Sequence, residues 1–372
     1  MAVTFPTASL LPIAGNGSQL GPHLSRSGYT CLAVYLAVVC LLSVAGNAVV
    51  IFLYARYQSL HNVVNIFLLN ICVADIIVAV LGTPLSLASS VAGHWLFGSA
   101  GCSWYGFICT FSGCAQIVGI AAVSLQRFFF VVKPFVARRL TTGGALVCVG
   151  FTWAYSLVAA LPPALGWSEF VLEGAGTSCS VNWQTGSRSY TFFIFVMILV
   201  LPLSIIVFSY SQVLVTVKKM AKCQVGNRRF RRADKKVTIM VVVMMITFMV
   251  SWSPYAILAL YSAFGNSAYL PPLVTTLPAM FAKASTAYNP VIYFLLHDKF
   301  REALCYLLTC RRFERNLAIG PTTNPCKNNA ILPSTLRAKL GFPLRAKSKG
   351  GEEKLQAVGS VRASLHPPGA TV

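Results

Sequence analysis

Seven long apolar segments dominate this 372-residue sequence and constrain the fold more than any other feature. Each exceeds the ~20 residues needed to cross the hydrocarbon core of a bilayer. Inside lipid a backbone must satisfy its own hydrogen bonds, and the segments lack the alternation of membrane-barrel strands, so each is predicted to be a helix. The segments cover residues 29–54, 63–92, 100–125, 144–166, 190–217, 237–264 and 269–296. The sequence therefore predicts an all-α membrane protein, a seven-helix bundle.

The distribution of charge predicts the orientation of this bundle. With 56% hydrophobic and 10% charged residues, the chain is too apolar for an ordinary soluble domain. With the N-terminus outside, the outer loops hold only Arg26 and Arg188, whereas the third inner loop carries nine basic residues between Lys218 and Lys236. Basic loops favour the cytoplasmic side, so we expect an N-out, C-in protein of the plasma membrane.

The net charge of +21 does not indicate a nucleic-acid partner, because the basic residues lie between apolar segments instead of on a soluble face. No motif of a soluble enzyme is present either, and we expect the protein not to be an enzyme. The scattered cysteines show no metal-ligand spacing, so no metal-cysteine site is expected.

Three regions follow from these patterns. Residues 1–28 form an extracellular segment with a glycosylation sequon at Asn16, residues 29–310 form the seven-helix domain, and residues 311–372 form a basic cytoplasmic tail of disordered composition. A short amphipathic helix follows the seventh span. It carries Cys305 and precedes Cys310, for which palmitoylation and unmodified thiols near the membrane lipid are alternatives.

Two of the twelve cysteines face the oxidising outer side. Cys102 opens the third helix, and Cys179 lies in the loop between helices four and five. Because disulfides persist in an oxidising compartment, we predict that these two are paired.

Lys283 is the most unusual residue in the predicted spans. It stands fourteen residues after Tyr269 and thirteen before Leu296, which places it about 20 Å from either helix end at ~1.5 Å per residue. A lysine stem is too short to reach water from there. Burial disfavours the ammonium form and leaves a neutral nucleophile that can condense with an aldehyde to form an imine. The alternative is a lysine paired with a buried carboxylate or with carbonyl groups.

Few carboxylates are placed to neutralise a cation at Lys283. Six of the nine lie at or beyond the cytoplasmic boundary, namely Asp234, Asp298, Glu302, Glu314, Glu352 and Glu353. Asp75 is in the middle of the second helix, whereas Glu169 and Glu173 are in the loop that Cys179 would tether. Spacing alone leaves the two glutamates as alternative partners.

An ordered set of motifs runs through the spans. It consists of Gly46-Asn47, Leu69-Asn70 through Asp75, Cys102, Arg127, Trp153, Pro202, Tyr210, Trp252-Ser253-Pro254-Tyr255 and Asn289-Pro290-Val291-Ile292-Tyr293. Over about residues 29–310 this set resembles the rhodopsin-like (class A) G-protein-coupled receptors. The resemblance implies a heterotrimeric G protein as partner, with arrestin and a receptor kinase. It assigns coupling and activation to Arg127, Tyr210, Asp234, Asn289, Pro290 and Tyr293.

The position of Lys283 narrows this resemblance to opsins, because it lies six residues before Asn289, like the chromophore lysine of that family. The chain is similar to non-visual opsins of the neuropsin and encephalopsin kind. The resemblance implies retinal, 11-cis or all-trans, bound to Lys283. Tyr105 stands where vertebrate visual opsins carry the counterion glutamate. Glu173, six residues after Trp167 and six before Cys179, matches the loop glutamate of many non-visual opsins, so the resemblance favours Glu173 over Glu169 as the counterion. It also implies a retinal pocket of Tyr105, Gly113, Phe248, Trp252, Tyr255 and Ala256.

The chain departs from the receptor pattern at Gln126-Arg127-Phe128, where the family carries an acidic residue, arginine and tyrosine. The neighbouring carboxylate for Arg127 is therefore absent, and Asp234 at the start of helix six remains as a cross-helix partner. High basal activity and weakened coupling are both hypotheses for this change.

A polar hub is expected near the midplane from Asp75, Asn47 and Asn289. A sodium ion at Asp75, as in related receptors, and a plain hydrogen-bonded cluster are alternatives. The function expected for the whole chain is that of a light-sensing receptor. A retinal photoisomerase with weak coupling and a ligand-activated receptor that does not use retinal are the alternatives.

Overall fold

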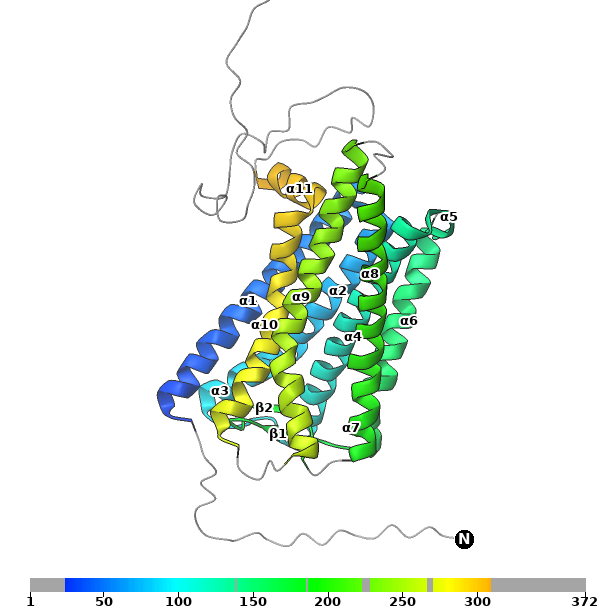
Figure 1. Cartoon of the computed structure of the whole chain (residues 1–372). Coiled ribbons are helices and arrows are strands. Elements are labelled where there is room, and N and C mark those ends of the chain that lie inside the picture. The colour runs from blue at the N-terminus through cyan, green and yellow to red at the C-terminus, as the bar shows by residue number, and fades with distance from the viewer. Residues whose placement is uncertain (1–23, 138, 185–186, 223–227, 266–269, 309–372) are drawn as a thin grey trace, which may run out of the picture. The chain divides into compact units, whose positions relative to one another are not determined.

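The computed structural model describes residues 24–308, apart from 138, 185–186, 223–227 and 266–269, and omits the side chains of residues 220–235. The predicted glycosylation site Asn16, the tail 311–372 and Cys310 lie outside the described residues. The described part is a bundle of long helices, with a small hairpin at one end and a short helix across the other (Figure 1).

The helices follow the apolar segments. The α-helices that make up the spans are α1 (Arg26–Arg56), α2 (Val63–Leu81), α3 (Thr83–Ala92), α4 (Gly98–Val132), α6 (Thr142–Ala160), α7 (Arg188–Phe195), α8 (Leu201–Lys222), α9 (Arg228–Phe264) and α10 (Pro272–Leu296). The fifth span also contains the π-helix η3 (Val196–Val200), and the helices outside the spans are α5 (Pro134–Ala137), α11 (Asp298–Leu308), η1 (Gln58–Leu60) and η2 (Pro162–Leu165).

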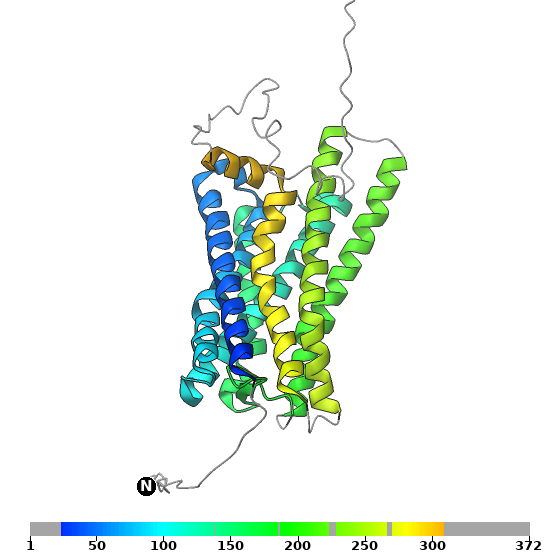
Figure 2. The ribbon, with the colours of Figure 1, turned by 90° about the vertical axis from the view of Figure 1, so that its left-hand side faces the viewer.

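Six stretches of helix in the described chain are long and apolar enough to cross a membrane. They are Arg26–Arg56, Val63–Ala92, Gly98–Val132, Thr142–Ala160, Arg188–Lys219 and Lys236–Phe264. The seventh span is α10, which packs against α9 and α1 within the same bundle (Figure 2). The expected seven-helix architecture is therefore confirmed.

Side-chain caps mark where several of the helices begin. Ser25 accepts a hydrogen bond from the backbone N–H of Gly28 at the start of α1, and Asn62 accepts one from Asn65 at the start of α2. Both residues thereby satisfy a backbone donor that has no partner within the helix. The polar residues between apolar segments thus set the helix boundaries.

The second span is broken into α2 and α3, a feature that the apolar pattern does not predict. The break falls at Gly82, just before Pro84, whose ring cannot donate a hydrogen bond to the preceding turn. The hydroxyl of Thr83 donates to the carbonyl oxygen of Val78 at 3.2 Å. This bond compensates for the interrupted ladder inside the membrane.

The fifth span is irregular for a similar reason. The π-helix η3 lies directly before Pro202, and Tyr155 of α6 donates its hydroxyl to the carbonyl oxygen of Met197 at 2.8 Å. A side chain from a neighbouring helix therefore satisfies a backbone group in the irregular turn.

A β-hairpin closes the outer end of the bundle and is here called the lid (residues 170–181). Strands β1 (Phe170–Glu173) and β2 (Ser178–Val181) are antiparallel, with Glu173 opposite Ser178. The turn between them uses Gly174 and Gly176 at positive φ, a conformation that glycine adopts without strain.

The lid is attached to α4 by covalent and packing contacts. The predicted disulfide between Cys102 and Cys179 is confirmed, with an S–S distance of 2.08 Å. Next to it, a Cβ atom on Gly106 would lie 2.4 Å from the ring of Phe170, so only glycine lets the hairpin approach this closely. The lid is therefore held over the outer mouth of the bundle.

The close approach of α1 to α10 at Gly46 can be tested by substitution. A Cβ atom on Gly46 would lie 2.9 Å from the Pro290 ring, closer than packed side chains allow. We expect Gly46→Ala to lower the free energy of unfolding by about 1–3 kcal/mol because the two helices must separate. Thermal unfolding of the purified protein measures this change.

The matched control for this variant is Gly150→Ala on the exposed face of α6, where an added Cβ meets nothing within 4 Å. It should leave the melting temperature unchanged or raise it, because alanine favours helix. Equal losses in both variants would contradict the close contact between α1 and α10.

Candidate functional site

A cavity of about 410 Å³ lies inside the bundle beneath the lid. Its volume is within the ~300–1,000 Å³ of small-molecule sites, and its walls are mainly apolar, as is usual for such sites. The residues that the sequence associates with a chromophore all line it, namely Tyr105, Gly113, Glu173, Phe248, Trp252, Tyr255, Ala256 and Lys283. Three helices (α4, α9 and α10) and the lid supply these side chains.

Lys283 projects from the middle of α10 into this cavity. Its Nζ atom lies 5.5 Å from the centre of the Tyr105 ring, which is within the range of a cation–π contact. Among the described residues, no ion pair joins Lys283 to a carboxylate. The amine therefore faces an apolar space large enough for a ligand instead of being held in a salt bridge.

Glu173 is the carboxylate that shares the cavity with Lys283. Its Oε1 atom accepts a hydrogen bond from Ser178 at 3.2 Å, and its Oε2 atom accepts one from Tyr255 at 3.5 Å. Glu169 is exposed and accepts a hydrogen bond from Asn182 at 2.7 Å. Of the two loop glutamates, Glu173 thus lines the cavity with the amine, whereas Glu169 faces solvent.

One buried hydroxyl group stands out near Lys283. The hydroxyl group of Tyr105, which lines the cavity, has no hydrogen-bond partner among the described residues. Buried polar atoms usually bond to protein, water or ligand. This part of the cavity wall therefore offers a polar group to an occupant or to ordered water.

Trp252 forms the inner wall of the cavity. Its indole Nε1 donates to Ser285 at 3.2 Å, and its ring stacks on Phe248 and meets Tyr255 edge-on. A Cβ atom on Gly113 would lie 2.7 Å from the indole, so the glycine makes room for it. Any change in the cavity that displaces Trp252 must also move α9, α4 or α10.

Comparison with known proteins identifies the family. Residues 46–293 match the family described as 7 transmembrane receptor (rhodopsin family). The chain is 35% identical to a pinopsin of Gallus gallus, covering 79% of this chain and 85% of the pinopsin. It is 33% identical to a visual pigment-like receptor peropsin of Mus musculus, covering 84% and 93%. It also matches the crystal structure of squid rhodopsin with 30% identity and a TM-score of 0.72, covering 79% and 90%.

The chain belongs to the rhodopsin family of seven-transmembrane receptors. It is an opsin, a light-sensing receptor that crosses the plasma membrane several times. Receptors of this family couple to G proteins and in general are not enzymes.

The polar hub of this opsin differs from the expected one. Asp75 is fully buried and accepts hydrogen bonds from the amides of Gln116 at 2.8 Å and Asn289 at 2.9 Å. Asn47 instead donates its amide to the carbonyl oxygens of Thr286 and Ser43, at 3.0 and 2.9 Å. Asn47 therefore bonds to the backbone of α10 and not to Asp75. Gln116 occupies the position beside Asp75 that was expected for Asn47.

The inner end of the opsin holds a second cavity, of about 470 Å³, which Arg127 lines. Arg127 is buried, and its guanidinium lies 5.0 Å from the centre of the Phe130 ring. The hydroxyl groups of Tyr210 and Tyr293 are buried and have no hydrogen-bond partner among the described residues. The side chain of Asp234, the predicted partner of Arg127, lies outside the described residues.

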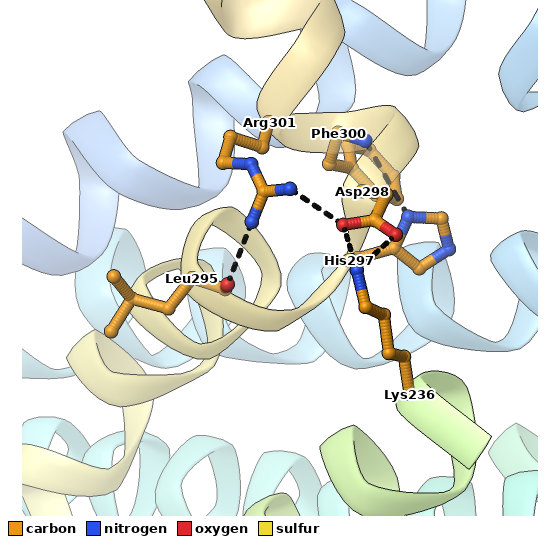
Figure 3. Close-up of polar contacts among 6 residues, drawn as sticks. All are labelled: Lys236, Leu295, His297, Asp298, Phe300 and Arg301. Atoms are coloured by element: carbon orange, nitrogen blue, oxygen red, sulfur yellow. Dashed lines mark hydrogen bonds and ion pairs between the residues drawn. The ribbon is translucent and has the colours of Figure 1, made fainter. Parts of the chain in front are cut away.

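An ion pair joins α9 to α11 beside this inner cavity (Figure 3). Lys236 of α9 contacts Asp298 at 2.7 Å, and Arg301 contacts the other carboxylate oxygen at 2.6 Å. Partial burial alone would raise the pKa of Asp298, but hydrogen bonds and charges from Lys236 and Arg301 outweigh it and hold that pKa below its usual value. Asp298 therefore stays ionised at physiological pH.

His297 lies next to this pair at the end of α10. Burial lowers the pKa of its imidazole to about 4, so the ring is neutral at physiological pH. Its Nδ1 atom accepts a hydrogen bond from the backbone N–H of Phe300 at 3.4 Å, and Phe300 stacks on Tyr293. These contacts dock the start of α11 onto the end of α10.

Cys305 lies on the buried face of α11, and its palmitoylation stays a prediction.

Sequence reasoning missed three functional contacts of this opsin. Gln116 is an uncharged residue among apolar ones in the third span, and a search for charged groups passes over it. Ser285 next to Lys283 gives no sign of its contact with Trp252. Asp298 was assigned only to the cytoplasmic boundary, since spacing does not reveal a partner 62 residues away.

The ion pair between α9 and α11 gives a test of dark-state restraint. Outward movement of α9 would break it, so Asp298→Asn should favour the active arrangement. Exposed pairs contribute up to about 1 kcal/mol, so dark nucleotide exchange on a G protein should rise by about twofold to fivefold. The measurement uses purified receptor kept in darkness.

The charge-swapped double variant Lys236→Asp/Asp298→Lys is the control for this test. It should bring dark exchange back toward the starting value, although Arg301 would then face a lysine. Dark exchange that is unaltered in Asp298→Asn would show that this pair does not restrain α9.

Proposed function

We propose that this opsin holds retinal at Lys283, with Glu173 as the counterion, and passes the effect of light to a heterotrimeric G protein at its inner end. The observation that carries the proposal is the placement of the Lys283 amine in an apolar cavity that it shares with Glu173. Lysine is the residue that captures aldehydes, and a cation formed there needs a carboxylate nearby.

The cavity fits a long apolar aldehyde. Aromatic and aliphatic side chains form most of its wall, and the charged groups that line it are Lys283 and Glu173. When bound covalently at Lys283, retinal supplies the absorption of light and a change of shape. The protein supplies the amine, the surrounding shape and the counter-charge.

Glu173 is held in place by the lid. Ser178 and Tyr255 each donate a hydrogen bond to its carboxylate, and Trp183 in turn donates to the Tyr255 hydroxyl at 3.3 Å. Because no direct ion pair joins Lys283 to a carboxylate in the part of the chain that the structure describes, the carboxylate acts across a gap that the Tyr105 hydroxyl or a water molecule can bridge. The disulfide keeps this arrangement over the cavity and limits the entry of water.

Trp252 connects the cavity to the inner end. It lies two residues before Pro254 inside α9, and a proline loosens the helix at this point. A displaced indole would bias α9 between two packings, and outward movement of α9 would open the inner cavity beside Arg127 to a G protein. Arrestin and a receptor kinase are proposed to bind the same inner face, and the basic tail to touch anionic lipid.

A retinal photoisomerase with weak coupling is the second candidate. Gln126 in place of an acidic residue favours it, because the neighbouring partner of Arg127 is missing. The buried tyrosines Tyr210 and Tyr293 and the Asp75–Asn289 bond favour signalling instead. Light-dependent nucleotide exchange on a G protein distinguishes the two, since an isomerase would form pigment without it.

The attachment site can be tested directly. Purified protein incubated with 11-cis or all-trans retinal should acquire an absorption band that Lys283→Ala lacks. Reduction with borohydride should fix retinal covalently to the peptide that contains residue 283. A correctly folded protein that never becomes labelled would instead support a ligand-activated receptor that does not use retinal.

The counterion can be tested by comparing two glutamates of the same loop. Glu173→Gln should shift the absorption of the retinal-loaded protein from the visible toward the near-ultraviolet at neutral pH, because a neutral amide stabilises a nearby cation far less. Absorption spectra recorded over a range of pH should show the visible form only under more acidic conditions than in the unmodified protein.

Glu169→Gln is the matched control, since Glu169 is exposed and bonds to Asn182. It should keep the original spectrum. A visible spectrum retained in Glu173→Gln and lost in Glu169→Gln would reverse the assignment.

A further inference from the structure

Gln116 connects two parts of the opsin that are otherwise described separately. Its side chain is 2% exposed and lines the retinal cavity together with Trp252 and Lys283. The same side chain donates a hydrogen bond from Nε2 to Asp75 at 2.8 Å. Gln116 therefore belongs both to the floor of the cavity and to the polar hub below it.

The orientation of the amides at Asp75 follows from hydrogen-bond chemistry. In both contacts with Asp75 the amide nitrogen donates and a carboxyl oxygen accepts. Gln116 points its NH₂ group at Oδ1, and Asn289 points its NH₂ group at Oδ2 at 2.9 Å. Both oxygens of Asp75 are thus occupied by neutral donors from α4 and α10.

In this arrangement the donor set does not form a sodium site at Asp75. A cation needs several oxygen atoms directed at it, whereas both carboxylate oxygens are faced by N–H groups. The amide oxygens of Gln116 and Asn47 are buried and have no hydrogen-bond partner among the described residues, so a sodium site would require the Gln116 amide to turn. Asn47, a further amide of the expected hub, is engaged with carbonyl oxygens of α1 and α10. The carboxamide of Gln116 lies where an ion would have to contact Oδ1.

The position of Gln116 on α4 also relates it to Trp252. Gly113, on which the indole rests, precedes Gln116 by three residues, so both lie on one face of the helix. The second carboxyl oxygen of Asp75 accepts a hydrogen bond from Asn289, which directly precedes Pro290 inside α10. The chain of contacts thus runs from the cavity floor to a helix with a proline kink, an element able to take two packings.

We propose that Gln116 takes the place of a bound cation at Asp75 and, as a positioning residue, holds Asn289 in its dark arrangement through that carboxylate. The proposal rests on the light-receptor function proposed above. Its prediction is that repacking around Trp252 weakens the Gln116–Asp75 bond and so releases α10 at Pro290. The hydrogen bonds at Asp75 would then change when the side chains around the cavity repack, and they would not depend on the sodium concentration.

The first test replaces the amide without changing its size. Gln116→Met keeps a long side chain at the cavity floor but removes the donor to Asp75. Loss of a buried hydrogen bond to a carboxylate favours departure from the dark arrangement, so dark nucleotide exchange should rise roughly tenfold when it is expressed per molecule of pigment formed. Ser112→Ala is the control, because Ser112 is a buried polar residue of the same helix.

A double-variant comparison tests whether Gln116 acts through Asp75. If it does, adding Gln116→Met to Asp75→Ala should change dark exchange no further, because the acceptor of the Gln116 hydrogen bond has already been removed. Independent, multiplicative increases in the two variants would overturn the proposal. So would dark exchange in Gln116→Met equal to that of the unmodified protein.

The second test uses the unmodified chain and remains valid even if the variants fold poorly. The melting temperature of the dark receptor should be the same in sodium chloride and in N-methyl-D-glucamine chloride at equal ionic strength. Stabilisation by sodium would show that the Gln116 amide turns to offer its oxygen, which would overturn the proposal. Failure of the light-receptor function would be recognised separately, as an unmodified protein that forms no pigment.

Discussion

The arrangement of this opsin depends on keeping one amine inside the membrane without a permanent salt bridge. Lys283 is placed in the middle of α10, and the nearest carboxylate that shares its cavity comes from the lid. The lid reaches this position only because the Cys102–Cys179 disulfide ties it to α4 and because Gly106 lets Phe170 approach. Under the proposed function, an extracellular hairpin thereby supplies the counter-charge for an amine of α10.

The cost of burying polar groups explains why so few are present and why each is specifically placed. At the midplane, Asp75 is bonded to amides from two other helices, and Asn47 bonds the backbone of α10. Such contacts are directional, so they hold α1, α2, α4 and α10 in one relative arrangement. Apolar packing alone would allow these helices to slide, because lipid offers similar contacts.

Most of the architecture could be predicted from the sequence, because helix number and orientation follow from segment length and basic loops. The break at Gly82, the π-helix at Val196–Val200 and the β-hairpin could not. Each arises from a proline, or from contacts with another segment such as the Tyr155 hydroxyl on Met197, which a pattern along the chain does not contain. Tertiary contacts therefore decide the local irregularities.

In the candidate site, too, some features could be predicted from the sequence and others depend on tertiary contacts. The side chains named by resemblance all line one cavity, because the motif spacing on α9 and α10 fixes which helix face they occupy. The choice between Glu173 and Glu169 depended on the pleat of β1 and its pairing with β2, which places Glu173 opposite Ser178. Gln116 escaped notice because an uncharged amide gives no electrostatic signal in a sequence, although its contact with Asp75 is entirely electrostatic in origin.

At the inner end of the bundle, the chain lacks the acidic residue that the receptor family carries before Arg127, but other contacts still connect α9 to its neighbours. Gln126 removes the acidic neighbour of Arg127, and yet α9 is still tied to the rest of the bundle by Lys236 and Asp298. That pair is about half exposed, so water screens it and its contribution is small beside a buried contact. The buried contacts around Trp252 and Asp75, which lie next to the cavity proposed to hold retinal, are therefore expected to restrain the dark state more strongly than this exposed pair does.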